Sequence, residues 1–151
     1  MIGNAGVMQL KPLLELDAAD WDGLLSVNVT GVFLSLQAAA RHMLQQGPLA
    51  PGRPRGKIIN LASVAGRPGA GPIASVMAHY RASKAALNSV LKDASLVLAG
   101  KAICVAFHPG WVRTDMGGAG ADLDVAQAVS DMRRTLAGLR PQDNGAYLNH
   151  D

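Results

Sequence analysis

The order of the apolar runs constrains the fold of this chain more strongly than any other feature. Residues 57–63 and 102–107 are short runs rich in branched apolar side chains, which is the pattern of strands buried on both faces of a sheet. Met1–Val7 carries the end of a further strand, and 146–149 predicts a last one. Glycine and proline clusters separate these runs from longer segments with a helical period.

The longer segments have apolar residues at the spacing of amphipathic helices. Strands that alternate with such helices predict parallel βαβ units joined by right-handed crossovers. We therefore expect a single domain over 1–151 with an α/β fold, a three-layer Rossmann-like parallel sheet of about three to four strands with flanking helices. The expected helices cover about 20–46, 80–98 and 124–139, and the aspartates that could cap the first and the last are Asp17, Asp20, Asp122 and Asp124.

Composition and charge exclude several classes of protein. The chain is 49% hydrophobic and 17% charged, which is typical of a globular domain and not of a disordered one. The net charge is +3, but the densest basic cluster, 53–57, stands among prolines, so we expect a solvated loop there and no nucleic-acid partner. Cys104 is the single cysteine and the four histidines lie far apart, so we expect neither a disulfide nor a metal site.

Targeting and membrane signals are absent from the sequence by inspection. Met1 is not followed by the basic, apolar and small-residue regions of a signal peptide. We also expect no apolar run long enough to span a bilayer. The expectation is a soluble, cytoplasmic protein without a membrane partner.

Tyr80 and Lys84 form a pair whose chemistry depends on helical spacing. Four residues are about one helical turn, so the two side chains lie on one face with the ammonium beside the phenol. A phenol titrates near pH ~10, and a neighbouring cation favours the phenolate, which suits the pair to proton exchange. On the spacing alone, a packed tyrosine beside a solvated lysine is the commoner arrangement.

Two further polar residues stand where a ligand site would need them. Asn28 falls on the apolar stripe of the 20–46 segment, so it is either a structural amide with partners or part of a site. Ser63 ends the 57–63 run, and the carboxyl ends of parallel strands are where ligands bind, although a serine there is more often a turn former. Gly6 lies in a small-residue turn that allows a ligand to approach the backbone.

A glycine-rich match at 69–74 invites a different interpretation. The residues read Gly-x-Gly-x-x-Ala, as in a dinucleotide fingerprint, with Asp93 about twenty residues further on. Asp93 falls inside the 80–98 helix, whereas the fingerprint needs its acidic residue at the end of a second strand. We therefore interpret 69–74 as a flexible loop over a pocket.

With these elements placed, the sequence resembles the carboxyl-terminal two-thirds of the short-chain dehydrogenases/reductases. Each motif is weak alone, but all of them in the family's order are specific. The runs 108–118 and 132–139 are similar to a narrower branch, the C-factor or sniffer-like carbonyl reductases. The motifs are Asn4-Ala5-Gly6, Asn28 within 27–31, Ser63, Tyr80 with Lys84, and Pro109-Gly110 followed by Val112 and Thr114.

The resemblance implies an NAD(P)-dependent oxidoreductase that moves hydride between a nicotinamide and a carbonyl or alcohol substrate. In that scheme Tyr80 exchanges the proton, and Lys84 lowers the pKa of the phenol and bonds the nicotinamide ribose. Ser63 orients the substrate carbonyl, and Asn28 holds a water linked to Lys84. The residues that would line NAD or NADP are Asn4, Ala5, Gly6, Tyr80, Lys84, Pro109, Gly110, Val112 and Thr114.

The resemblance also implies a missing part and a way of pairing. Family members begin with a strand, a glycine-rich turn and a helix that hold the adenosine half of the cofactor, so we expect an N-terminally truncated domain without that half-site. Gly3 stands where the family commonly has an asparagine. The helices that start near Asp20 and Tyr80 are those that the family uses for subunit pairing, so a homo-oligomer is expected.

Two other functions compete with the oxidoreductase. A catalytically inactive, truncated homologue could keep the scaffold and act as an interaction or signalling protein. A serine hydrolase that uses Ser63 with His79 or His108 is more remote, because the sequence has no nucleophile elbow.

Overall fold

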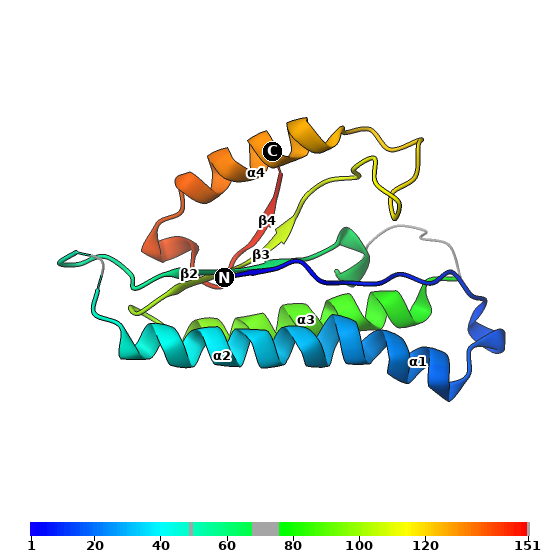
Figure 1. Ribbon diagram of the computed structural model, residues 1–151, viewed down its shortest axis with the longest axis horizontal. Helices are drawn as coiled ribbons and strands as arrows, with labels where there is room; N and C mark the ends of the chain where they lie inside the picture. Colours follow the sequence, from blue (N-terminus) through cyan, green and yellow to red (C-terminus); the bar gives the residue numbers. More distant parts are fainter. Residues whose placement is uncertain (49, 68–75, 151) are drawn as a thin grey trace.

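A parallel sheet forms the centre of the computed structural model, which describes residues 1–48, 50–67 and 76–150. Its strands are β1 (Ile2–Gly3), β2 (Lys57–Leu61), β3 (Ile103–His108) and β4 (Tyr147–Asn149). They lie in the order β1-β2-β3-β4, and each neighbouring pair is parallel (Figure 1). The expected parallel α/β sheet is confirmed.

Helices cover both faces of the sheet and give three layers (Figure 1). On one side of the sheet, α2 (Val32–Gln45) and α3 (Ala78–Val97) pack against the strands, and α1 (Ala18–Leu25) packs against α3. The other face packs on α4 (Val125–Ala137). Side chains alternate between the faces along each strand. Ile58 and Cys104 therefore pack with α2 and α3, whereas Ile59, Val105 and Phe107 pack against α4.

The three crossovers do not share one hand, which differs from the expectation. Successive strands are added in the same direction across the sheet, yet the third connecting helix, α4, lies on the opposite face from the helices of the first two connections (Figure 1). The β3–α4–β4 crossover therefore has the opposite hand. The long connection 109–124 makes this geometry accessible, because it carries the chain around the carboxyl edge of the sheet before α4 begins.

The first long helix starts earlier than expected and contains an irregular turn. Asp17 is its N-cap and forms a capping box with Asp20, so the helix begins at Ala18. A π-helical segment, η2 (Ser26–Gly31), then separates α1 from α2 and carries Asn28. The continuous helix Ala18–Gln45 is long and apolar enough to cross a membrane by length and composition, contrary to the expectation, although core helices of soluble domains pass the same test.

Short turns complete the described chain. The 3-10 turns are η1 (Leu13–Glu15), η3 (Val64–Gly66) and η4 (Pro141–Asp143). The strand expected over 57–63 ends at Leu61, so Ser63 becomes the N-cap of η3, and its hydroxyl accepts from the Ala65 amide at 3.2 Å. Residues 69–74, which we interpret as a loop, lie outside the described residues.

Candidate active site

The candidate site is assembled at the carboxyl ends of three adjacent strands. Asn4 follows β1, Ser63 follows β2 and Pro109 follows β3. Because the strands are parallel, these segments meet at one edge of the sheet, beside the first turns of α3. Tyr80 and Lys84 project from those turns and are each only 7% exposed.

Asn28 joins three segments of the chain through its amide. Its Oδ1 accepts from the Val7 amide at 2.8 Å, and its Nδ2 donates to the Val7 carbonyl at 2.9 Å and to Ser83 Oγ at 3.1 Å. The Ser83 hydroxyl donates in turn to the Tyr80 carbonyl at 2.8 Å. Both hydrogens of the Asn28 side-chain amide are donated within the chain. A water can therefore bind Asn28 only by donating to its side-chain or backbone carbonyl oxygen.

Lys84 lies close to both the tyrosine and the small-residue turn after β1. Its Nζ donates to the Leu61 carbonyl at 3.0 Å and lies 5.7 Å from the centroid of the Tyr80 ring. A Cβ built on Gly6 would lie 3.6 Å from that Nζ and 3.5 Å from Asn28 Oδ1, so the turn passes directly over the pair. An ammonium has three donors, so Lys84 retains donors for a ligand hydroxyl.

Burial dominates the protonation of the pair. Desolvation raises the pKa of Tyr80, and a hydrogen bond with Ser63 acts in the opposite direction. Desolvation also lowers the pKa of Lys84, because burial disfavours its charged form. The expected lowering of the phenol pKa by Lys84 is therefore not what this structure shows: the net shift of Tyr80 is upward.

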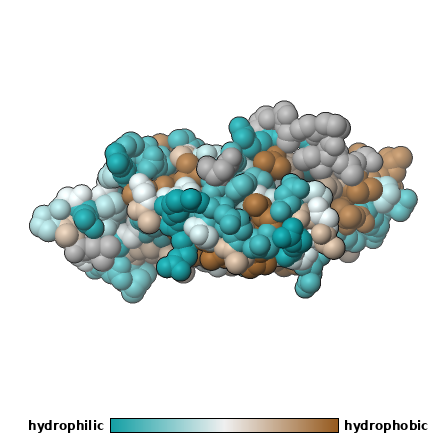
Figure 2. Space-filling view, turned by 90° about the horizontal axis from the view of Figure 1, so that it is seen from above, coloured by the Kyte–Doolittle hydropathy of each residue, from teal (hydrophilic) through white to brown (hydrophobic). Residues whose placement is uncertain are grey.

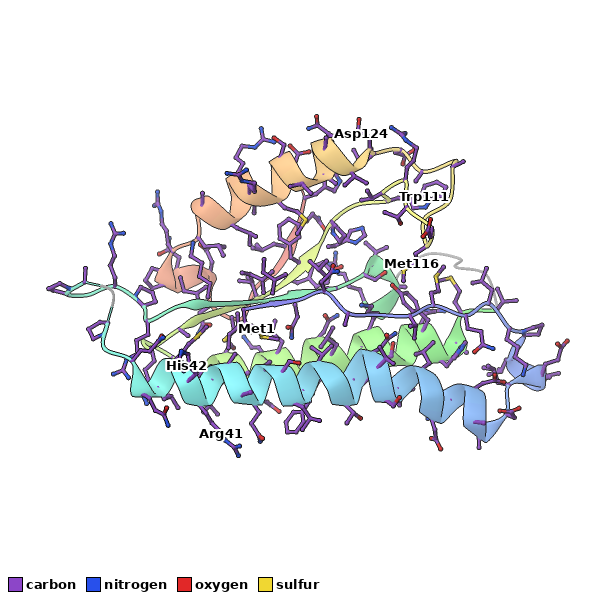
Figure 3. The ribbon with its side chains drawn as sticks, in the orientation of Figure 1. Met1, Arg41, His42, Trp111, Met116 and Asp124 are labelled. Atoms are coloured by element: carbon purple, nitrogen blue, oxygen red, sulfur yellow. The ribbon has the colours of Figure 1, made fainter. Side chains whose placement is uncertain are left out.

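The segment after β3 is held by its own contacts. Gly110 has a positive φ of 84°, and Val112 bridges to Leu123. Thr114 Oγ1 donates to the Val112 carbonyl at 3.4 Å and accepts from the Gly117 amide at 3.1 Å. Figure 3 shows Trp111 and Met116 on this connection, with Met116 at the tip nearest the sheet. The topology brings Pro109, Gly110, Val112 and Thr114 to the same edge as Tyr80.

Some contributing residues carry no strong signal in the sequence. Ser83 bridges Asn28 to Tyr80, and only its place in the Tyr-x-x-Ser-Lys spacing marks it. Gly66 lets η3 approach α3, because a Cβ there would lie 2.6 Å from the Lys84 carbonyl carbon. His79 is fully buried, and its ring nitrogens have no hydrogen-bond partner among the described residues, so it does not activate Ser63.

Comparisons with known proteins show the family to which the chain belongs. The family model described as short chain dehydrogenase matches residues 1–122. The chain belongs to the short-chain dehydrogenase family. It is 35% identical over 152 aligned positions to C-signal of Myxococcus xanthus, covering 99% of this chain and 87% of that protein.

Solved structures of short-chain dehydrogenases share the fold. The carbonyl reductase Sniffer of D. melanogaster superposes with a TM-score of 0.83 and 32% identity. The NADPH-bound carbonyl reductase from chicken fatty liver gives a TM-score of 0.87 and 31% identity. Each comparison covers 99% of this chain and 62% of the other, so the chain spans less than two thirds of these reductases.

The donors at this site fit the nicotinamide end of a dinucleotide. Lys84 is a buried cation that donates to a single carbonyl among the described residues. Its remaining N–H groups can donate to ribose hydroxyls, which are hydrogen-bond acceptors. Gly6 places bare backbone beside that cation. Asn4, Ala5 and Gly6 continue from β1, where a flat ring could lie against the turn.

Proposed function

We propose that this chain is an NAD- or NADP-dependent oxidoreductase acting on a carbonyl or alcohol substrate. The observation that carries the proposal is the convergence of Tyr80, Ser63, Lys84 and Asn28, from three separate segments, at one edge of the sheet. Family membership supports the reaction class. Two solved relatives, a carbonyl reductase with NADPH bound and a gluconate 5-dehydrogenase in complex with NADP and tartrate, support the cofactor.

Each side chain has a distinct task in this proposal. A bound nicotinamide supplies or accepts the hydride. The Tyr80 hydroxyl gives its proton to the substrate oxygen in reduction and takes it back in oxidation. Ser63 holds that oxygen with a second hydrogen bond. Lys84 holds the ribose, and its positive charge beside the ring opposes the desolvation that raises the phenol pKa.

The experiment that tests the proposal is a titration with NADH and NADPH, following nicotinamide fluorescence and the unfolding midpoint together. We expect saturable binding and a rise in Tm. Tyr80→Phe should then abolish carbonyl reduction while sparing cofactor binding. Tyr147→Phe is the matched control, because Tyr147 is the second of two tyrosines and lies on β4.

Two results would contradict the oxidoreductase. A folded chain that binds neither dinucleotide at millimolar concentration cannot use one in catalysis. Equal turnover by wild type and Tyr80→Phe would show that the Tyr80 hydroxyl takes no part in the reaction. Loss of activity in both tyrosine variants would point to structural damage and not to proton transfer.

The similarity to C-signal supports a second candidate function. That relative is 35% identical over nearly the whole of this chain, and its name indicates a signal. An inactive homologue that acts by binding a partner would tolerate Tyr80→Phe without losing its effect. The same pair of tyrosine variants therefore separates signalling by the folded surface from signalling through catalysis.

We also propose a cytoplasmic homo-oligomer that pairs through the helices that start near Asp20 and Tyr80. The outer face of Ala18–Gln45 exposes large apolar side chains, including Trp21, Phe33 and Leu34 at 40%, 41% and 55%. Burying such a face between two copies would stabilise a dimer. Light scattering on wild type and Leu34→Glu tests this: the variant should be monomeric, and an unchanged mass would exclude this face.

A further inference from the structure

The amino ends of the strands form a surface that differs in charge from the rest of the molecule. In a parallel α/β sheet, the last turns of the helices and the connections that follow them meet at this end. Here they are the ends of α2, α3 and α4 and the connections after them, at the left in Figure 1. We name this surface the amino edge, and it comprises residues 41–48, 50–57, 92–102 and 133–146.

Hydrogen bonds join these segments into one continuous surface. Arg55 donates its backbone amide to the Lys101 carbonyl at 2.7 Å and a guanidinium hydrogen to the Leu44 carbonyl at 2.6 Å. Lys57 Nζ reaches the Leu136 carbonyl at the end of α4 at 2.5 Å. Asn144 donates to the Ser95 carbonyl at 2.8 Å. The ends of all three helices are thereby fixed relative to one another.

The amino edge concentrates the positive charge of the chain. Nine of the 14 lysines and arginines lie on it with two of the 11 acidic residues, which gives +7, whereas the whole chain carries +3. Arg55 and Lys57 bond helix-end carbonyls, and Arg134 pairs with Asp131. The other six make no side-chain ion pair within the described residues, and all are exposed: Arg41, Arg53, Lys92, Lys101, Arg133 and Arg140.

Helix dipoles do not account for this charge. Each helix end contributes about −0.5 of a charge, so three ends call for less than two cations. Arg55 and Lys57 already bond helix-end carbonyls. The six remaining cations are therefore in excess of what the fold needs. Figure 3 shows one of them, Arg41, pointing away from the sheet near the end of α2.

Aliphatic side chains stand exposed among these cations. Leu96 and Val97, in the last turn of α3, are 65% and 73% exposed, and Leu44 at the end of α2 is 39% exposed. Leu96 lies one turn after Lys92, so apolar and cationic groups alternate on the same helix face. Figure 2, by comparison, shows hydrophobic surface gathered at the opposite, right-hand end of the molecule.

We propose that the amino edge docks on a membrane surface that carries anionic lipid. Phosphate headgroups complement the six unpaired cations, and the aliphatic side chains can enter the boundary between headgroups and acyl chains. A nucleic acid would use the cations but not Leu96 and Val97, and neither tryptophan nor either phenylalanine lies on this surface to stack a base. The candidate active site, at the opposite edge of the sheet, would remain open to solvent.

The test is flotation of the full chain with two kinds of vesicle, pure phosphatidylcholine and phosphatidylcholine with one third phosphatidylglycerol. We expect binding only to the anionic vesicles, with loss in 0.5 M salt as screening predicts. Lys92→Gln with Lys101→Gln should weaken the apparent affinity by roughly thirtyfold. Leu96→Ser with Val97→Ser should weaken it by roughly tenfold without changing the net charge.

The matched control changes the net charge equally at the other end. Val125→Glu with Ala126→Glu adds two negative charges in the first turn of α4, where a helix tolerates them. Equal binding to both vesicles, or equal loss in the control and the lysine variant, would overturn the proposal, as would binding of a DNA duplex but not vesicles. If the lysine variant unfolds, Arg133→Gln with Arg140→Gln makes the same test.

Discussion

Gly66→Ala probes the contact that sets Ser63 against the Tyr80 helix. The new Cβ would lie 2.6 Å from the Lys84 carbonyl carbon, 2.7 Å from Lys84 Cβ and 2.9 Å from the Ala85 nitrogen. Ordinary van der Waals contact begins at 3.4 Å, so the shortest of these distances is about 0.8 Å too small. All three atoms belong to the helix itself and cannot rotate away. Either η3 or α3 must therefore move.

The cost follows from the size of that displacement. Overpacking by a single methyl group in a close-packed interior costs about 1–3 kcal/mol. For a domain of this size, 1 kcal/mol lowers Tm by roughly 2–4 °C, so we expect a fall of roughly 3–10 °C. In the oxidoreductase assay, kcat should fall further than stability alone explains, because the shift separates Ser63 from Tyr80.

A matched glycine in another helix provides the control. Gly23 lies in α1, and a Cβ there would meet nothing within 4 Å. Gly23→Ala should raise the free energy of unfolding by about 0.5–1 kcal/mol, because alanine favours the helical backbone. Both variants are measured by urea and thermal unfolding. An unchanged Tm in Gly66→Ala would refute the packing argument, whatever the control does.

Three further outcomes follow from the structure. Asn28→Ala should lower the free energy of unfolding, measured in urea, by about 2–4 kcal/mol, because it leaves the Val7 N–H and C=O without their amide partner. The control Ser35→Ala removes an exposed hydrogen bond from a hydroxyl and should lower it by less than about 1 kcal/mol. Burial raises the pKa of Cys104 to about 11, so the thiol should not react with a disulfide reagent at pH 8 until the chain is unfolded. The same shift means that the unfolded thiol ionises first, so stability should fall between about pH 9 and pH 11, and Cys104→Ala should flatten that part of the pH profile.

Periodicity was sufficient to predict the layers of this fold. The apolar runs at 57–63 and 102–107 correspond to β2 and β3, because short runs of branched apolar residues favour strands that are buried on both faces of a sheet. Asp17 and Asp124 cap the helices that they precede, as their side chains favour. These features depend on neighbours in the sequence, and local chemistry predicts them.

Features that depend on distant contacts could not be predicted in the same way. The face chosen by α4 depends on how the 109–124 connection rounds the sheet, and no local pattern encodes that choice. The upward pKa shift of Tyr80 depends on total burial, which the Tyr-Lys spacing does not report. Gly66 looks like any loop glycine until the helix beside it is known. The motif order predicted which residues gather, and their mutual distances required the structure.

The π-helical turn at Ser26–Gly31 also affects how relatives should be compared. In a regular helix each residue rotates the side-chain direction by about 100° around the axis, and a π-helical turn contains one residue more than a regular turn. A single-residue deletion anywhere between 26 and 31 would restore an ordinary helix, yet rotate α2 against α1 and withdraw Asn28 from Val7 and Ser83. A relative whose aligned sequence has a one-residue gap at this point is therefore expected to lack the Asn28 contacts of the site, even if it has the residues of every motif.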